Sequence, residues 1–158
     1  MTNMVLSEVL SEKVINLTLK AKTKEEAIDE LSQLLFENHL IDSTVDFADD
    51  VLSREKAGVT GLGKGLAIPH GKSESVIKTS IAIGRTQFPI PWESLDDQPV
   101  TIVILFAVKN TDANTTHIKM LQNIAICLAD DEFIEQLHTI NHPTEMIQLF
   151  IEKEGKRS

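Results

Sequence analysis

The sequence predicts an α/β fold in which a mixed β-sheet lies between layers of helices, a three-layer α/β/α sandwich. Two observations predict it. Short apolar segments typical of strands alternate along the chain with segments whose apolar residues repeat at helical spacing. The connections between the strand segments are long enough to cross over a sheet face. The 158 residues contain no repeat or linker, so we expect one domain over residues 1–158, with its core at about residues 8–150.

The first elements are a short strand and a helix. Residues 14–19 (VINLTL) alternate apolar and polar side chains, which predicts a short strand. Thr23 and Glu26 then form a capping box, and apolar residues follow at helical spacing. This helix is expected to end near Asn38. A second helix is expected to begin after Ser43 or Thr44 and to end near residue 56.

The middle of the chain predicts strands and the end predicts helices. Residues 80–84 (SIAIG) are strand-like, Pro89 and Pro91 indicate a turn, and residues 100–108 (VTIVILFAV) predict a central strand buried on both faces. The helices predicted after these strands cover residues 117–128, residues 132–137 behind a cap at Asp130 or Asp131, and a last helix opened by Pro143.

The composition excludes several classes of protein. The formal net charge is −9, with 24 acidic and 15 basic residues, which argues against nucleic acid and against anionic membrane surfaces and favours a basic partner surface. The longest apolar run is too short to span a bilayer, and the first residues do not form a secretory signal. The single cysteine rules out an internal disulfide framework. We therefore expect a cytoplasmic protein.

The segment 54–71, REKAGVTGLGKGLAIPHG, is the most informative part of the chain. Glycine lets backbone N–H groups approach a ligand, and successive N–H groups make an anion cradle. The glycines that we expect to form a phosphate-binding loop are Gly61, Gly63, Gly65 and Gly71.

A nucleotide-binding P-loop does not fit this segment. Residues 58–64 match the first seven positions of the Walker A pattern, but the eighth is Gly65 in place of the hydroxyl residue that holds Mg²⁺. The segment also follows a predicted helix and leads into Pro69, whereas a P-loop follows a strand and opens a helix.

His70 is the candidate catalytic residue. Pro69 and Gly71 flank it, so the imidazole lies at a turn beside the glycines. Near pH 7 a neutral imidazole nitrogen can accept a phosphoryl group, since its ordinary pKa is about 6.5. The alternative is a surface turn histidine without a role.

Two further residues complete the predicted site. His117 follows cap-type residues at a helix N-terminus, which favours a bound anion. Arg54 precedes the glycine segment, and a guanidinium binds phosphate through two hydrogen bonds. Each has a plain alternative, a first-turn histidine without a role and a cation at a helix C-terminus.

The remaining candidates are expected to be structural or solvent-exposed. Glu55 and Lys56 are predicted to lie in solvent, and Cys127 to lie in the core on an apolar helix face. The other three histidines show no metal-ligand spacing with one another or with the site, so no metal site is predicted; they are His39, His138 and His142.

The pattern of residues 54–56 (REK) and 60–71 (TGLGKGLAIPHG), with residues 95–100 (LDDQPV) and residues 116–117 (TH), resembles the enzyme IIA domains of the fructose/mannitol family of the bacterial sugar phosphotransferase system. The likeness covers residues 8–150 and includes the nitrogen-related members. It implies that His70 carries the phosphoryl group and that His117 and Arg54 assist. Where the family often has Asn this chain has Lys64, which either contacts phosphate or lies in solvent.

The resemblance implies a two-step relay without metal or nucleotide. His70 takes the phosphoryl group from the carrier protein HPr and gives it to a cysteine of a IIB component in a membrane-associated IIB/IIC complex. That cysteine is not expected in this chain, so a free-standing IIA protein of a fructose-type pathway is the favoured interpretation.

Two alternatives stay open. The first is a regulatory protein of the nitrogen-related branch, which binds its targets according to its phosphorylation state. The second is a histidine-based metal hydrolase, which needs a carboxylate near His70 and His117.

Overall fold

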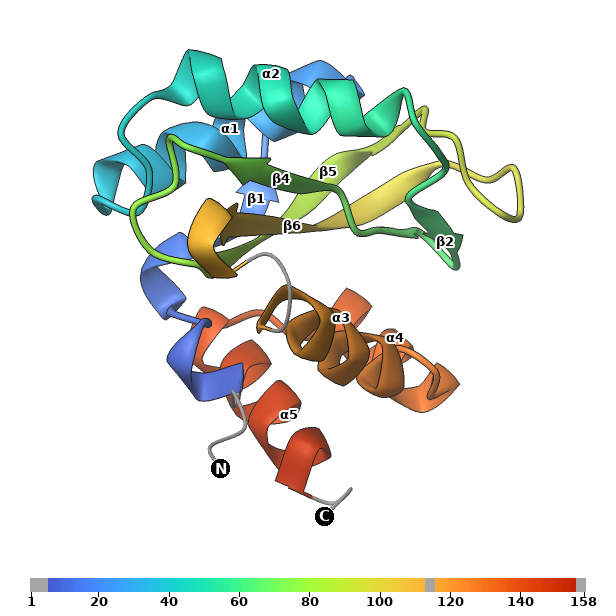
Figure 1. Cartoon of the computed structure of the whole chain (residues 1–158). Helices are drawn as coiled ribbons and strands as arrows, with labels where there is room; N and C mark the ends of the chain where they lie inside the picture. Colours follow the sequence, from blue (N-terminus) through green and yellow to red (C-terminus); the bar gives the residue numbers. More distant parts are fainter. Residues whose placement is uncertain (1–5, 113–115, 156–158) are drawn as a thin grey trace.

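The computed structural model describes residues 6–112 and 116–155, except for the side chains of residues 112, 116 and 117. A mixed sheet lies between helices on both of its faces, with α1 and α2 on one face and α3, α4 and α5 on the other (Figure 1). The helices are α1 (Lys24–Glu37), α2 (Thr44–Glu55), α3 (Thr116–Cys127), α4 (Asp131–Thr139) and α5 (Pro143–Gly155). The predicted three-layer arrangement is confirmed.

The sheet is built around one long central strand. The strands are β1 (Ile15–Leu19), β2 (Gly61–Gly63), β3 (Leu66–Ala67), β4 (His70–Ser73), β5 (Ser80–Ile90) and β6 (Val100–Lys109). Their order is β1-β5-β6-β3-β2, and β4 also pairs with β6. β3 and β4 run parallel to β6, β5 runs antiparallel to it, and β1 runs parallel to β5. Because β3 and β4 follow one another along the same edge of β6, the chain from residue 66 to residue 73 is held in a fixed register.

Each face of the sheet closes its own hydrophobic core. One core joins α1 and α2 to the sheet, with Leu31 and Phe47 fully buried in it. The other joins the sheet to α3, α4 and α5 and includes Phe106 and Phe150. Residues 102–108 of β6 are buried without interruption, as expected for a strand covered on both faces.

The predicted helix ends agree with the structure. Thr23 caps α1 by accepting a hydrogen bond from the Glu26 N–H, and Ser43 caps α2 in the same way. Asp130 is the N-cap of α4, and Pro143 opens α5. These local signals are strong because they satisfy backbone N–H groups that have no partner within the helix.

Two local expectations are corrected. β5 does not stop at Gly84 but continues through Pro89, in a stretch where the pairing with β6 is irregular. That irregularity accommodates a residue that cannot donate a backbone hydrogen bond. The glycine segment is also not an open loop, because β2 and β3 pair as a hairpin around Lys64 and Gly65. Both turn residues have positive φ, 58° and 81°, as a two-residue hairpin turn of this kind requires.

Candidate functional site

His70 is the first residue of β4 and lies half-buried where that strand pairs with β6. Its Nδ1 is 2.8 Å from the carbonyl oxygen of Ile68. The imidazole and the ring of Phe106 pack edge to face, with centroids 5.9 Å apart. A carbonyl oxygen only accepts, so Nδ1 carries the proton, and in the neutral ring the lone pair is on Nε2. The fold therefore selects one tautomer of His70.

The surroundings of His70 favour its neutral form. Burial lowers the pKa of His70 below 6.5, and the positive charge of Arg54 lowers it further. The hydrogen bond to Ile68 and the negative charge of Glu55 oppose these effects without reversing them. A pKa below 6.5 leaves the imidazole uncharged near pH 7, the form in which its nitrogen is a nucleophile.

The end of α2 lies close to His70, through Arg54 of the helix and through the packing of Gly71 of β4 against it. Arg54 lies in the last turn of that helix and is close enough to lower the pKa of His70. Gly71 packs directly under α2, where a Cβ atom would lie 2.7 Å from Val51 Cγ2 and 2.8 Å from Phe47 Cε1. Gly71 is thus required for close packing of β4 on α2, which fixes the distance between the helix end and His70.

The other predicted phosphate-loop glycines are not brought to His70. Gly61, Gly63 and Gly65 belong to the β2–β3 hairpin. Leu66, the residue after the hairpin turn, pairs with Ile102, whereas His70 pairs with Phe106. Four residues along β6 correspond to about 13 Å, and Gly61, whose partner Ala67 pairs with Val103, is about 10 Å from His70 along the strand.

Each hairpin glycine has a local structural reason. A Cβ on Gly61 would lie 2.5 Å from the backbone oxygen of Glu93. Gly63 and Gly65 have φ of +95° and +81°, which residues with a Cβ rarely adopt.

The side chain of Glu55 is buried at the end of α2. The prediction that it lies in solvent is wrong, because its side chain is only 4% exposed and forms an ion pair with Lys24 at 3.1 Å. Its Oε2 also accepts a hydrogen bond from the Thr60 hydroxyl at 2.7 Å. The sequence contains an indication of this burial, because Glu55 follows Phe47 and Val51 at a spacing of four residues, on the buried face of α2. Lys56, by contrast, is exposed as predicted.

Lys64 and His138 belong to the hairpin end of the sheet. The Lys64 side chain is 55% exposed and pairs with Asp131 of α4. His138 Nε2 donates to the backbone oxygen of Lys64 at 2.9 Å, so that α4 holds the hairpin turn. Lys64 therefore lies at the surface, on the part of the hairpin that is distant from His70.

His117 belongs to the first turn of α3, which confirms that it lies near a helix N-terminus. Its side chain lies outside the described residues, so its predicted role at the site stays a prediction. Cys127 is fully buried, as expected. Within residues 6–112 and 116–155, no group of three His, Cys, Asp or Glu residues could hold a metal ion, and no helix is long and apolar enough to cross a membrane.

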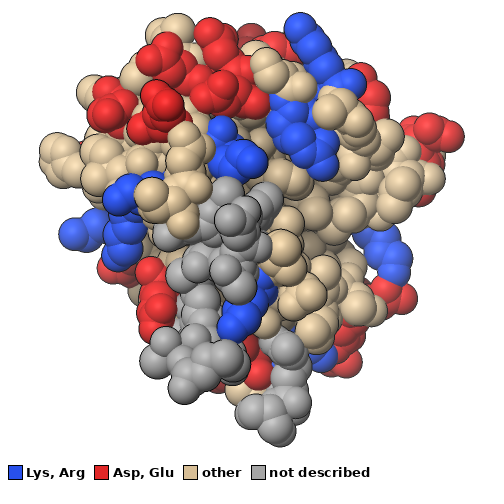
Figure 2. Space-filling view, in the orientation of Figure 1, with Lys and Arg blue, Asp and Glu red and all other residues tan. Residues whose placement is uncertain are grey.

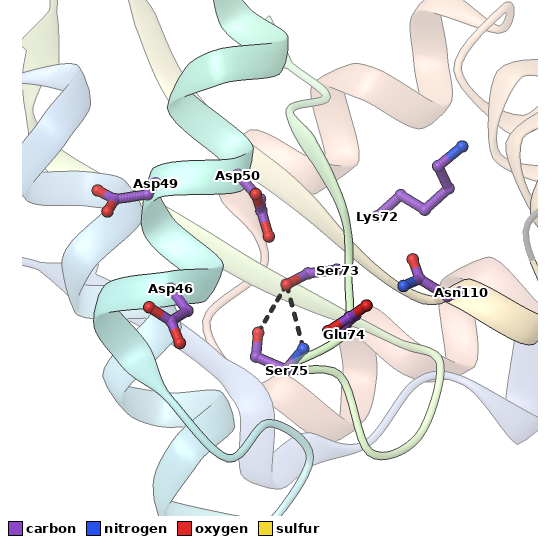
Figure 3. A pocket seen from close by; sticks show the side chains of 8 residues that line it. All are labelled: Asp46, Asp49, Asp50, Lys72, Ser73, Glu74, Ser75 and Asn110. Atoms are coloured by element: carbon purple, nitrogen blue, oxygen red, sulfur yellow. Dashed lines mark hydrogen bonds between the residues drawn. The ribbon is translucent and has the colours of Figure 1, made fainter.

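An acidic hollow of about 520 Å³ lies beside the C-terminal end of β4, at Ser73. Figure 3 shows the carboxylates of α2 on one side, Lys72 and Asn110 on the other, and the hydrogen bonds between Ser73 and Ser75 in the middle. The lining residues are Asp46, Asp49, Asp50, Lys72, Ser73, Glu74, Ser75 and Asn110. Figure 2 shows that acidic side chains also gather over the region of α1 and α2.

Residues 8–153 match the family model described as "Phosphoenolpyruvate-dependent sugar phosphotransferase system, EIIA 2". The fructose-specific EIIABC component of Bacillus subtilis is 36% identical over 134 residues, which are 85% of this chain and 21% of that protein. This chain thus spans about a fifth of the length of that relative.

Two solved structures have the same fold. The nitrogen regulatory protein IIA-Ntr from Neisseria meningitidis gives a TM-score of 0.82 at 30% identity, covering 90% of this chain and 97% of that one. The mannitol IIA enzyme of Escherichia coli, solved in complex with phosphorylated IIB, gives a TM-score of 0.76 at 27% identity, again covering 90% and 97%.

Proposed function

The chain belongs to the EIIA 2 family of the phosphoenolpyruvate-dependent sugar phosphotransferase system, and we propose that it is a phosphoryl carrier that uses His70. In this proposal His70 accepts the phosphoryl group from phospho-HPr and passes it to a cysteine of a IIB component. The observation that carries the proposal is the 2.8 Å contact between His70 Nδ1 and the Ile68 carbonyl, which leaves the nucleophilic lone pair on Nε2.

The chemistry follows from that tautomer. The Nε2 lone pair forms a new N–P bond as the N–P bond of the donor phosphohistidine breaks and its electron pair returns to the donor nitrogen. The Ile68 carbonyl holds the Nδ1 proton and stabilises the positive charge that develops on the ring. In the second step a thiolate attacks phosphorus, and the N–P electron pair returns to Nε2.

The charge of the phosphoryl group needs a counterpart at the site. We assign this role to Arg54, whose charge already acts on His70, because a guanidinium binds phosphate oxygens through paired hydrogen bonds. We keep His117 as an assisting residue, since α3 begins at Thr116 and a helix N-terminus favours an anion. Catalysis then consists of positioning and electrostatic stabilisation, with no cofactor.

The partners are part of the proposal. The complex of the mannitol IIA enzyme with phosphorylated IIB supports a IIB partner for this chain. The acidic side chains of α2 and of the segment after β4 support a donor with a basic surface, and we assign the role of donor to HPr. We place the relay in the cytoplasm, in sugar uptake of the fructose type, which the 36% identity to a fructose-specific component supports.

A regulatory role is the second candidate, favoured by the likeness to IIA-Ntr. The two roles share the phosphohistidine and differ in the fate of its phosphoryl group. Onward transfer to a IIB cysteine, and genes for IIB and IIC beside this one, indicate transport. A phosphohistidine that no IIB component discharges, encoded near nitrogen-regulation genes, indicates regulation.

Intact-protein mass spectrometry tests the proposal. The protein is incubated with phosphoenolpyruvate, enzyme I and HPr, with His70→Ala as the matched variant. We expect one acid-labile phosphoryl group on the wild type and none on the variant. Equal labelling of the variant, or an unlabelled wild type beside phosphorylated HPr, would contradict it.

A further inference from the structure

The buried carboxylate of Glu55 is the start of a hydrogen-bonded chain that ends at His70. Glu55 Oε2 accepts the Thr60 hydroxyl at 2.7 Å, and the same hydroxyl oxygen accepts the indole N–H of Trp92 at 3.1 Å. The other carboxylate oxygen of Glu55 forms an ion pair with Lys24, whose ammonium also lies over the Trp92 ring, 5.1 Å from its centroid. These two hydrogen bonds fix the Thr60 side chain. Because Thr60 is only 3% exposed, bulk water cannot replace them.

The backbone continues the chain from Thr60 to the imidazole. The carbonyl oxygen of Thr60 accepts the N–H of Ile68 at 3.0 Å. The carbonyl oxygen of the same Ile68 accepts Nδ1–H of His70 at 2.8 Å. A residue whose N–H and C=O are both held in this way has little freedom to rotate its peptide groups. The direction of the Ile68 carbonyl, and with it the tautomer of His70, therefore depends on where Thr60 is held.

We propose that Glu55 and Thr60 are positioning residues for phosphoryl transfer, because they hold the Ile68 peptide that orients the His70 ring. The inference rests on the proposed role of His70 and names two residues that act through Ile68 without touching the reacting atoms. Glu55 is also the neighbour of Arg54 at the end of α2. One anchor thus fixes both the helix end that carries the guanidinium and the peptide that orients the nucleophile.

The test uses three single variants of the whole chain. Thr60→Val keeps the shape of the side chain and removes the hydroxyl, whereas Thr60→Ser keeps the hydroxyl. Thr86→Val is the matched control, because Thr86 is also a buried threonine whose hydroxyl donates a hydrogen bond, in its case to the backbone oxygen of Phe88. It removes a comparable hydrogen bond at a site that is not part of the chain from Glu55 to His70.

The primary measurement is ¹⁵N NMR of the histidine rings, without any phosphoryl donor. In the wild type, Thr60→Ser and Thr86→Val we expect His70 to remain in the Nδ1–H tautomer. In Thr60→Val we expect a mixture that includes the Nε2–H form. The rate of phosphoryl acceptance from HPr should fall roughly threefold to tenfold in Thr60→Val and recover in Thr60→Ser, as loss of one buried hydrogen bond implies.

A Thr60→Val protein that keeps the tautomer as fully as Thr86→Val would overturn the inference. If Thr60→Val does not fold, Glu55→Gln decides in its place, since it weakens the charge-assisted bond to Thr60 and should shift the tautomer in the same direction. The NMR result needs no phosphorylation. A wild type that takes up no phosphate would therefore count against the proposed function alone, and the tautomer result would still decide the role of Thr60.

Discussion

The two halves of the segment from Arg54 to Gly71 use similar residues in different ways. In the half next to His70, one glycine lets β4 pack under α2, and Ile68 directs its carbonyl at the imidazole. In the β2–β3 hairpin, the glycines serve a tight turn and a close backbone contact, and α4 holds the turn through His138. A cluster of glycines in a sequence thus does not by itself indicate an anion cradle, because turns and close packing require the same residue.

The largest expected difference between the two halves concerns phosphoryl uptake. His70→Gln should reduce labelling by phospho-HPr to background, because the nucleophilic nitrogen is lost. Gly65→Ala should keep full labelling while it lowers stability by about 1–2 kcal/mol, since its φ of +81° opposes a Cβ. Mass spectrometry and urea unfolding measure the two effects. Loss of labelling in folded Gly65→Ala would instead indicate that the hairpin takes part in phosphate binding.

A change at Gly71 should act on packing as well as on uptake. In Gly71→Ala the new Cβ meets the side chains of Val51 and Phe47 at less than 3 Å, so these side chains must shift or α2 must move away from β4. We expect a loss of about 1–3 kcal/mol in unfolding free energy and slower phosphoryl acceptance. Chemical denaturation and a time course of labelling check both. An unchanged rate in the destabilised protein would show that the spacing between α2 and β4 does not matter for the site.

The pH dependence of phosphoryl acceptance should show the effect of the Arg54 guanidinium on the pKa of His70. Because burial and Arg54 lower the pKa of His70, the fall in phosphoryl acceptance on acidification should have its midpoint below pH 6.5. In Arg54→Gln one cause of the lowering is removed, so the pKa of His70 should rise.

NMR titration of the His70 ring in the two proteins measures that shift directly. Lys56→Gln, which neutralises an exposed neighbour of α2, is the matched control and should leave the midpoint closer to that of the wild type. A midpoint that does not rise in Arg54→Gln would show that the guanidinium does not act on the imidazole.

The acidic hollow beside β4 should give a smaller effect. Replacing Asp46 and Asp50 with Asn together should slow uptake from HPr about two- to fivefold at low salt, with the difference shrinking as salt increases. Labelling rates at several salt concentrations test this. Rates equal to the wild type at low salt would mean that the donor docks elsewhere.

The smallest effect is expected at Lys64. Its ion pair with Asp131 is exposed, so Lys64→Ala should change stability by less than about 1 kcal/mol and leave uptake unchanged. Thermal unfolding and labelling check the two parts. A clear loss of uptake in this variant would support a phosphate contact from Lys64.

The helices and the central strand could be predicted from the sequence because their signals are local. Thr23, Ser43 and Asp130 cap their helices as expected, and the apolar run of β6 is buried on both faces. The hairpin was missed because three-residue and two-residue strands have too few positions to show a period.

The candidate site also has a part that local sequence signals predict and a part that depends on the fold. His70 was predicted from its own flanking residues and stays the proposed acceptor, whereas the burial of Glu55 depends on Lys24 and Thr60, which only the fold brings to it. The orientation of the His70 ring depends on the backbone carbonyl of Ile68, and the direction of that carbonyl cannot be predicted from a pattern of side chains.

Histidine NMR of the phosphorylated protein tests the central claim most directly. The uniformly ¹⁵N-labelled chain is phosphorylated through enzyme I and HPr, and the ring that carries phosphorus is assigned nitrogen by nitrogen. We predict phosphorus on Nε2 of His70, with the proton still on Nδ1 facing the Ile68 carbonyl. Phosphorus on Nδ1 of His70, or on another histidine, would contradict the account.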